Sequence, residues 1–233
     1  IKDSTTEKNG VIKAGVGTAG NAINICGGTF TLESGNIYSL NNAILIDENA
    51  ATVNINGGKI TAEPNTNNSA VMYVSSTSDT VINIAGGEMV GCNGILLWNN
   101  TKINMTGGSI EAKGHTGIQG NGSKDNTEIT ISGGTVSGYY AAIYHPQGGK
   151  LNISGGELTG WTGVVVKGGN INISGGSISG TGAADTYRPV SSGYVDTGDG
   201  LYVEVFDNST NSENYGTPVV TVTGGAFNST NGA

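Results

Sequence analysis

Short runs in which apolar and polar residues alternate recur along the chain, and each run ends in a pair of glycines. In LNISGG, Leu151 and Ile153 alternate with Asn152 and Ser154, the period of two that places apolar side chains on one face of a strand. The pairs recur at intervals of 30, 29, 21, 26, 22, 20 and 49 residues, and self-similarity at such spacing predicts a stacked repeat. The pairs begin at Gly27, Gly57, Gly86, Gly107, Gly133, Gly155, Gly175 and Gly224.

Each repeat holds three short apolar runs, which leaves no room for a helix. After the corner at Gly155, Leu158 returns an apolar side chain to the interior, and a third run follows from Gly163 to Val166. Residues of the same type recur at the same place in every repeat, so successive coils should pair in parallel, about 4.8 Å apart. The sequence therefore predicts an all-β, right-handed, single-stranded parallel β-helix of about eight coils, with residues 1–233 as one domain.

Two ladders follow from this register. The outward one should stack Asn24, Asn54, Asn83, Asn104, Thr130, Asn152, Asn172 and Thr221, whose amides could hydrogen-bond along the axis or order water or ice. The inward one should bury β-branched and other apolar side chains. Its members are Ile23 and Ile25, Val53 and Ile55, Ile82 and Ile84, Ile103 and Met105, Ile129 and Ile131, Leu151 and Ile153, Ile171 and Ile173, and Val220 and Val222.

Composition excludes several classes of protein. The 41 glycines follow no G-X-Y period and prolines number only 4, which excludes collagen and simple linkers. A formal charge of -8 without a basic stripe argues against nucleic acid as a partner, and there is no apolar run long enough to span a membrane. Cys26 and Cys92 should lie two coils apart, beyond the reach of a disulfide, so both are expected to be free thiols.

The eight glycine corners, together with GGSISGTG and VDTGDGLYVE between Gly175 and Glu204, carry a resemblance to pectate-lyase-like right-handed β-helix proteins. Within these, the chain resembles the glycine-rich repeat regions of large secreted surface proteins of anaerobic gut bacteria. The resemblance implies an extracellular, secreted or cell-wall-attached location and a role as a stalk or binding module. It supplies no catalytic residue, because the basic cluster and Ca²⁺-binding carboxylates of a lyase groove have no match here. A solenoid that stops in mid-coil bares a pairing edge, so we expect a piece of a longer secreted protein.

The 49-residue interval contains two long loops, residues 181–200 and 206–218, and loops of this length are commonly functional. The first loop combines aromatic rings, a guanidinium and carboxylates, as sugar-binding sites do, or it could fold over the rod as a lid. Its candidate residues are Asp185, Tyr187, Arg188, Tyr194, Asp196 and Asp199.

Aromatic residues also gather at one corner of several coils, between the second and third strands. Stacking should align them in a column leading to the long loop, where they would bind pyranose rings or a protein partner. The column comprises Tyr38, His115, Tyr139, Tyr140 and Trp161. A second stripe should face outward on the third strands and pack under loops or against another molecule. It comprises Leu45, Met72, Leu96, Gln119, Tyr144, Val165 and Tyr202.

Catalysis would need two carboxylates about 5 to 5.5 Å or about 6.5 to 9.5 Å apart, as in glycoside hydrolases. The candidate groups are Glu88 with Glu111, or Asp196 with Asp199 and nearby Glu204. The alternative is that these carboxylates only form a solvated acidic surface. Asp196 and Asp199 could also hold Ca²⁺, although DTGDG is far short of a full calcium loop.

Three functions remain open on the sequence alone. The first is a non-catalytic cell-surface module, an adhesin or spacer that binds glycan or a host or neighbouring-cell protein along a side groove. Its expected binding residues are Trp161, Tyr139, Tyr140, His115, Tyr187, Arg188 and Tyr194. The second is a glycoside hydrolase or polysaccharide lyase that uses Asp196, Asp199 or Glu204. The third is a stalk without a ligand. No cofactor is expected, apart from the possible Ca²⁺ at Asp196 and Asp199.

Overall fold

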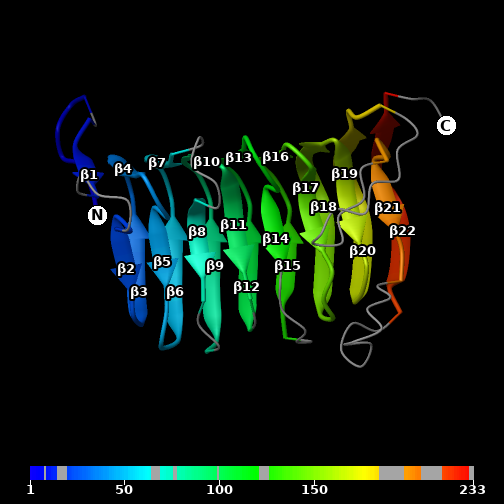
Figure 1. Ribbon diagram of the computed structural model, residues 1–233, viewed down its shortest axis with the longest axis horizontal. Helices are drawn as coiled ribbons and strands as arrows, with labels where there is room; N and C mark the ends of the chain where they lie inside the picture. The colour runs from blue at the N-terminus through cyan, green and yellow to red at the C-terminus, as the bar shows by residue number, and fades with distance from the viewer. Residues whose placement is uncertain are drawn as a thin grey trace.

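In a computed structural model, the chain forms a parallel β-helix whose coils follow one another along the long axis, from β1 at one end to β22 at the other (Figure 1). The structure describes residues 1–7, 9–14, 20–63, 69–75, 78–98, 100–120, 126–183, 197–205 and 217–230. Eight third strands are stacked in one sheet and enclose about seven complete turns, close to the predicted eight coils. The predicted fold class is therefore confirmed.

Each coil contributes three strands, which we call first, second and third in chain order. First and second strands join into one 14-stranded sheet that bends at the glycine corner, and the third strands form an 8-stranded sheet. The first strands are β3 (Gly28–Leu32), β6 (Ala51–Ile55), β9 (Thr80–Ile84), β12 (Thr101–Met105), β15 (Glu128–Ile131) and the leading halves of β18 (Lys150–Gly160), β20 (Asn170–Gly180) and β22 (Val219–Ser229).

The second strands continue from the glycine corner, and in the last three coils they are the trailing halves of β18, β20 and β22. The others are β1 (Val11–Lys13), β4 (Asn36–Ser39), β7 (Lys59–Ala62), β10 (Glu88–Gly91), β13 (Ser109–Ala112) and β16 (Thr135–Gly138). The third strands are β2 (Ile23–Ile25), β5 (Ile44–Ile46), β8 (Ala70–Val74), β11 (Asn93–Leu97), β14 (Ile118–Gly120), β17 (Ala141–His145), β19 (Thr162–Val166) and β21 (Leu201–Val203).

The core is the inward ladder of the three strands, and six of the predicted pairs fill it. Val53 stacks on Ile82 and Ile82 on Ile103, each fully buried. Burial of one such side chain contributes about 1.5 to 3 kcal/mol. In the last coil Val220 is only half-buried and Val222 is 48% exposed, because no further described coil covers them.

The first coil departs from the predicted register. Ile23 and Ile25 belong to a third strand, β2, because they pair with Ile44 and Ile46. The pair beginning at Gly27 therefore lies at the corner that leads from a third strand to the next first strand. The first coil instead bends at Gly35, which has a φ of 93°, like the second glycine of the later pairs. Asn24 accordingly stands outside the asparagine ladder.

The outward asparagine ladder forms as predicted from the next coil onward. Asn83 donates from Nδ2 to Asn54 Oδ1 at 2.9 Å, and Asn104 donates to Asn83 Oδ1 at 3.0 Å. Asn54 in turn donates to Thr31 Oγ1 at 3.2 Å, so Thr31 takes the place predicted for Asn24. Each donor points toward the preceding coil, which ties neighbouring coils together on the outside.

Replacing Asn83 by alanine should lower the free energy of unfolding by about 1 kcal/mol, because it removes one partly buried and one exposed hydrogen bond to neighbouring coils. Equilibrium urea denaturation measures the loss. Asn24→Ala is the matched control, since Asn24 lies outside the ladder and only accepts an exposed bond from Asn21. Equal effects of the two substitutions would show that the ladder contributes nothing specific.

One residue of the predicted third-strand stripe was assigned to the wrong face. Met72 is fully buried and pairs with Ile44 and Ile95, so it faces inward, and Tyr73 stands in the outward stripe between Leu45 and Leu96. AVMYV begins one residue earlier in the coil than AILI does, and a slip of one residue reverses the face of every side chain. Tyr144 and Val165 of the stripe are buried, whereas Leu45, Leu96, Gln119 and Tyr202 are partly exposed.

Both cysteines are free thiols, as predicted: Cys26 is exposed and Cys92 is buried. Within the described ranges, the chain has no helix of the length and apolarity that crossing a membrane requires.

Candidate ligand-binding groove

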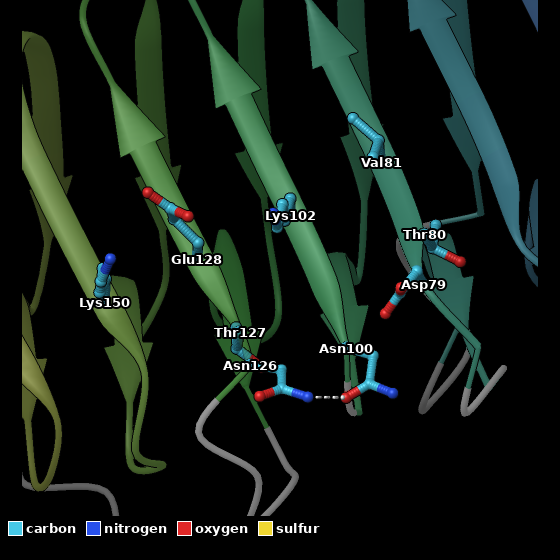
Figure 2. Close-up of a pocket in the computed structure, with 9 residues that line it drawn as sticks. All are labelled: Asp79, Thr80, Val81, Asn100, Lys102, Asn126, Thr127, Glu128 and Lys150. Carbon is cyan, nitrogen blue, oxygen red and sulfur yellow. Dashed lines mark hydrogen bonds between the residues drawn. The ribbon is translucent and has the colours of Figure 1, made fainter.

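A polar hollow of about 510 Å³ lies on the outer face of the first strands, near the end where each strand begins (Figure 2). Four successive coils build it, through β9, β12, β15 and β18. Because the coils are hydrogen-bonded in parallel register, the side chains that line the hollow project from a rigid sheet. Its lining comprises Asp79, Thr80, Val81, Asn100, Lys102, Asn126, Thr127, Glu128 and Lys150.

Charges alternate across the floor of this groove. The strand register places Lys102 beside Glu128 and Glu128 beside Lys150, so a carboxylate stands between two ammonium groups on neighbouring coils (Figure 2). Lys102 is the second residue of β12, whereas Glu128 and Lys150 are the first residues of β15 and β18, and the register aligns all three at one outward position. Within the described part of the chain, these three side chains take part in no salt bridge. Their charged groups therefore remain open to a ligand.

Amides and a further carboxylate form the rim. Asn126 donates from Nδ2 to Asn100 Oδ1 at 3.1 Å, across two neighbouring coils (Figure 2). Asn100 has a φ of 52°, a left-handed conformation that asparagine tolerates better than most residues. Asp79 lies exposed on the preceding coil. The groove thus presents hydrogen-bond donors and acceptors, and side chains of both charges, on one fixed surface. Such a surface suits a ligand rich in hydroxyl groups.

The predicted aromatic column is reduced to a local cluster. Tyr140 packs edge-on against His115, with ring centroids 5.5 Å apart, and against Tyr139 at 5.0 Å. Tyr139 is 54% exposed and offers a ring to solvent. Partial burial lowers the pKa of His115 from its ordinary value of 6.5.

Trp161 follows the cluster at the same corner of the next coil, where Thr162 N donates to Tyr140 O at 2.9 Å, whereas Tyr38 stands apart from it. Trp161 is half-buried on the next coil, and its indole packs on Gly182, where an added Cβ would lie 2.0 Å from Nε1. Tyr38 lies four coils before Tyr139, or about 19 Å at the strand spacing. Its hydroxyl donates to Glu63 at 2.8 Å, and that bond raises the pKa of Tyr38. Tyr38 is therefore not part of one surface with Tyr139.

The long-loop candidates lie mostly outside the described residues. These are Asp185, Tyr187, Arg188, Tyr194 and Asp196. Their proposed roles in sugar binding, catalysis or Ca²⁺ binding stay predictions. Among the residues that the structure does describe, no group of three or more His, Cys, Asp or Glu side chains could hold a metal ion.

Of the candidate carboxylates near the long loop, the two that the structure describes lie apart. Asp199 and Glu204 flank opposite ends of β21, a strand that alone spans about 10 Å. Glu204 is ion-paired with Lys167 at 2.9 Å, and that lysine side chain is only 7% exposed. Such a pair stabilises the corner and commits Glu204 to a structural contact.

Glu88 and Glu111 lie on neighbouring coils. Glu111 pairs with Val90, and Glu88 pairs with Ser109, so the two carboxylates are offset by two positions along the strand. Each has a cationic neighbour: Glu88 lies 2.7 Å from Lys59, and Glu111 lies 3.7 Å from Lys113. The alternative prediction of a solvated acidic surface fits both residues better than a catalytic pair.

Sequence reasoning missed the groove residues Lys102, Glu128 and Lys150. The signal was present, because in each of these coils a small residue is followed by a charge and then by the apolar alternation: TKINM, TEITI and GKLNI. Aligning those charges required the strand register. The groove exists only because the register places these three charged residues on neighbouring strands.

Comparison with known proteins adds no relative. Neither protein-family models, curated proteins nor solved structures give a match to this chain.

Proposed function

We propose that this chain is a non-catalytic extracellular β-helix module that binds a glycan in the groove on its first strands and acts as a spacer. The observation that carries the proposal is the strip of open charges, Lys102, Glu128 and Lys150, flanked by the amides of Asn100 and Asn126. Sugar hydroxyls both donate and accept hydrogen bonds, so they match a surface that offers both kinds of partner.

The charge balance of the groove indicates the class of glycan. Two ammonium groups, Lys102 and Lys150, face two carboxylates, Asp79 and Glu128, so the groove carries almost no net charge. A polyanionic chain would meet repulsion from the carboxylates and from the overall charge of -8. A neutral, hydroxyl-rich glycan is the better fit. The asparagine ladder extends this polar surface along the same strands.

An extracellular, secreted or wall-attached location belongs to the same proposal. It is supported by the resemblance to pectate-lyase-like β-helix proteins and to repeat regions of surface proteins from anaerobic gut bacteria. The parallel β-helix architecture is common to such proteins. In this setting a host or neighbouring-cell surface protein is the alternative partner, with the exposed ring of Tyr139 as its candidate contact.

The test is a glycan-array screen followed by titration of any ligand found. Lys102→Ala and Asn126→Ala should each weaken binding about tenfold, the equivalent of one lost polar contact of about 1.4 kcal/mol. Lys113→Ala is the matched control, because Lys113 is an exposed lysine at the second corner, away from the groove. Unchanged affinity in both groove variants, with loss in Tyr139→Ala, would move the binding site to the aromatic cluster.

Chromatography of the bound glycan separates binding from hydrolysis. We expect the glycan to be recovered intact, because Asp199 and Glu204 are held at opposite ends of β21 and Glu204 is paired with Lys167. Cleavage that is lost in Asp199→Asn would favour the alternative, a glycoside hydrolase or polysaccharide lyase using carboxylates of the long loop. If the array stays silent, the chain is a stalk and the proposal fails.

A further inference from the structure

Polar residues interrupt the apolar interior at one corner of the rod, where a third strand leads to the next first strand. The last inward position of the third strands holds Ile46, Val74 and Leu97 in successive coils and Val166 further on. Between them stand Gly120, which pairs with Leu97, and His145, which pairs with Val166. His145 therefore has an apolar neighbour, Val166, on one side of the ladder and a glycine on the other.

Gln147 fills the space that Gly120 leaves. A Cβ on Gly120 would lie 1.8 Å from Gln147 Oε1 and 2.4 Å from Nε2, so the amide rests directly on the glycine backbone. The amide belongs to the coil of His145 but reaches back into the preceding coil. Both side chains thus occupy the interior at neighbouring ladder positions, and both residues are 0% exposed.

Thr127 completes the polar group. It is 1% exposed and precedes Glu128 at the start of a first strand, so it faces inward in the coil that contains Gly120. Lys150 N donates to Thr127 O at 2.8 Å, which stacks Gly149 of the next coil against Thr127. Gly169 follows in the coil after that, and its Cα lies against His145, since an added Cβ would be 2.9 Å from Nε2. Because Gly149 and Gly169 are glycines, they add no side chain next to these three polar groups.

Five buried polar atoms of this corner have no hydrogen-bond partner within the described chain: both ring nitrogens of His145, Oε1 and Nε2 of Gln147, and Oγ1 of Thr127. A buried polar group without a partner is strongly unfavourable. Native proteins resolve such clusters with ordered water or an ion.

We propose that this corner is an internal binding site for ordered water, which bridges the side chains of His145, Gln147 and Thr127. Water suits the set because the carboxamide oxygen and one imidazole nitrogen accept, the amide and the other ring nitrogen donate, and the hydroxyl does both. A metal ion fits worse, since the described residues offer no cluster of three His, Cys, Asp or Glu ligands.

The site also adjoins the groove. Thr127 lines the groove wall beside Asn126, at the base of β15 (Figure 2). The bridging water therefore holds Thr127 in place on the interior side of the start of β15. Its two chain neighbours, Asn126 and Glu128, form the rim and floor of the groove on the outside. The hydrated corner and the groove share one backbone segment, but the water site does not depend on what the groove binds.

A high-resolution crystal structure of the chain is the direct test. We expect a water within 2.7 to 3.2 Å of polar atoms from at least two of the three side chains. Direct hydrogen bonds among His145, Gln147 and Thr127 without water, or a bound ion in its place, would overturn the proposal.

Solution NMR gives a second test. The methyl group of Thr127 should show a nuclear Overhauser effect to long-lived water, and Gln147→Met should abolish it because two of the bridging atoms are removed. The Thr101 methyl is the matched control: it lies at the same ladder position one coil earlier, where the inward third-strand residue is Leu97. A water signal equal at Thr101 and Thr127, or unchanged in Gln147→Met, contradicts a bridged site.

Discussion

Replacing Gly155 by alanine should lower the free energy of unfolding by about 2 to 3 kcal/mol, the upper part of the range for overpacking a tight interior. An added Cβ would lie 2.3 Å from the carbonyl oxygen of Ser132 and 3.0 Å from its carbonyl carbon, both in the preceding coil. The obstacle is backbone, which cannot rotate away as a side chain can. The same approach recurs at Gly175, 2.4 Å from Ser154 O, so one substitution reports on a contact that stacks the coils.

The second glycine of the pair is required for a different reason. Gly156 has a φ of +87°, a conformation that side chains disfavour, so Gly156→Ala should cost about 1 to 3 kcal/mol through backbone strain and its contact with Gly134. Gly28→Ala separates the two causes, because Gly28 has a φ of +80° but open space around it. It should lose only about 1 to 2 kcal/mol, the strain contribution.

Equilibrium denaturation in urea measures these differences, with Gly20→Ala as the neutral reference. Gly20 has nothing within 4 Å of an added Cβ and no positive φ, so its substitution should change stability by less than about 0.5 kcal/mol. If Gly155→Ala were as stable as Gly20→Ala, the coils could separate to admit a methyl group. Close backbone stacking would then not be what demands the glycine pairs.

These glycine requirements explain why the fold was predictable from sequence. In almost every coil one corner position has no room for a Cβ and the next has a positive φ, so both are glycine. The alternation of apolar and polar residues before each pair marks the buried face. Glycine pairs alone do not define one corner, however. The pair beginning at Gly27 follows a third strand, and the alternation of Ile23 and Ile25 looks the same on either sheet. Only pairing with Ile44 and Ile46 decides between the two.

The functional surface was less predictable because it depends on register between coils. Tyr139 and Tyr140 were expected to line a longer column, but the corner residues change from coil to coil, so the ring contacts of the described residues join only His115, Tyr139 and Tyr140. The charges of Lys102, Glu128 and Lys150 are 22 to 26 residues apart and look unrelated until the strands are stacked. Composition and local pattern carry no information on that adjacency.

Acid should destabilise the wild-type protein through His145, and His145→Leu should remove that effect. Burial lowers the pKa of His145 from 6.5 to about 4, since the imidazolium would lose its hydration in the interior. Above pH 6.5 the imidazole is neutral in both states and nothing is lost. As the pH falls from 6.5 toward 4, the unfolded chain binds a proton that the folded chain does not, so stability declines. At about 1.4 kcal/mol per pKa unit, the full loss is about 3 kcal/mol.

The comparison between wild type and His145→Leu isolates this histidine from the carboxylates that titrate in the same range. Leucine matches Leu97 and Val166 in the ladder, and the charged neighbours, the Lys167–Glu204 pair and the outward Glu128 and Lys150, are the same in both proteins. Urea denaturation at pH 7.5, 6, 5 and 4 should therefore give a stability difference that grows by about 3 kcal/mol in favour of the variant. His115→Gln, which changes the only other histidine, should leave most of the wild-type slope in place because His115 is partly exposed. Parallel profiles for wild type and His145→Leu would mean that the corner accommodates the imidazolium. In that case the five polar atoms of the corner are solvated well enough to hold a charged imidazolium. Burial of His145 would then not determine how stability falls at low pH.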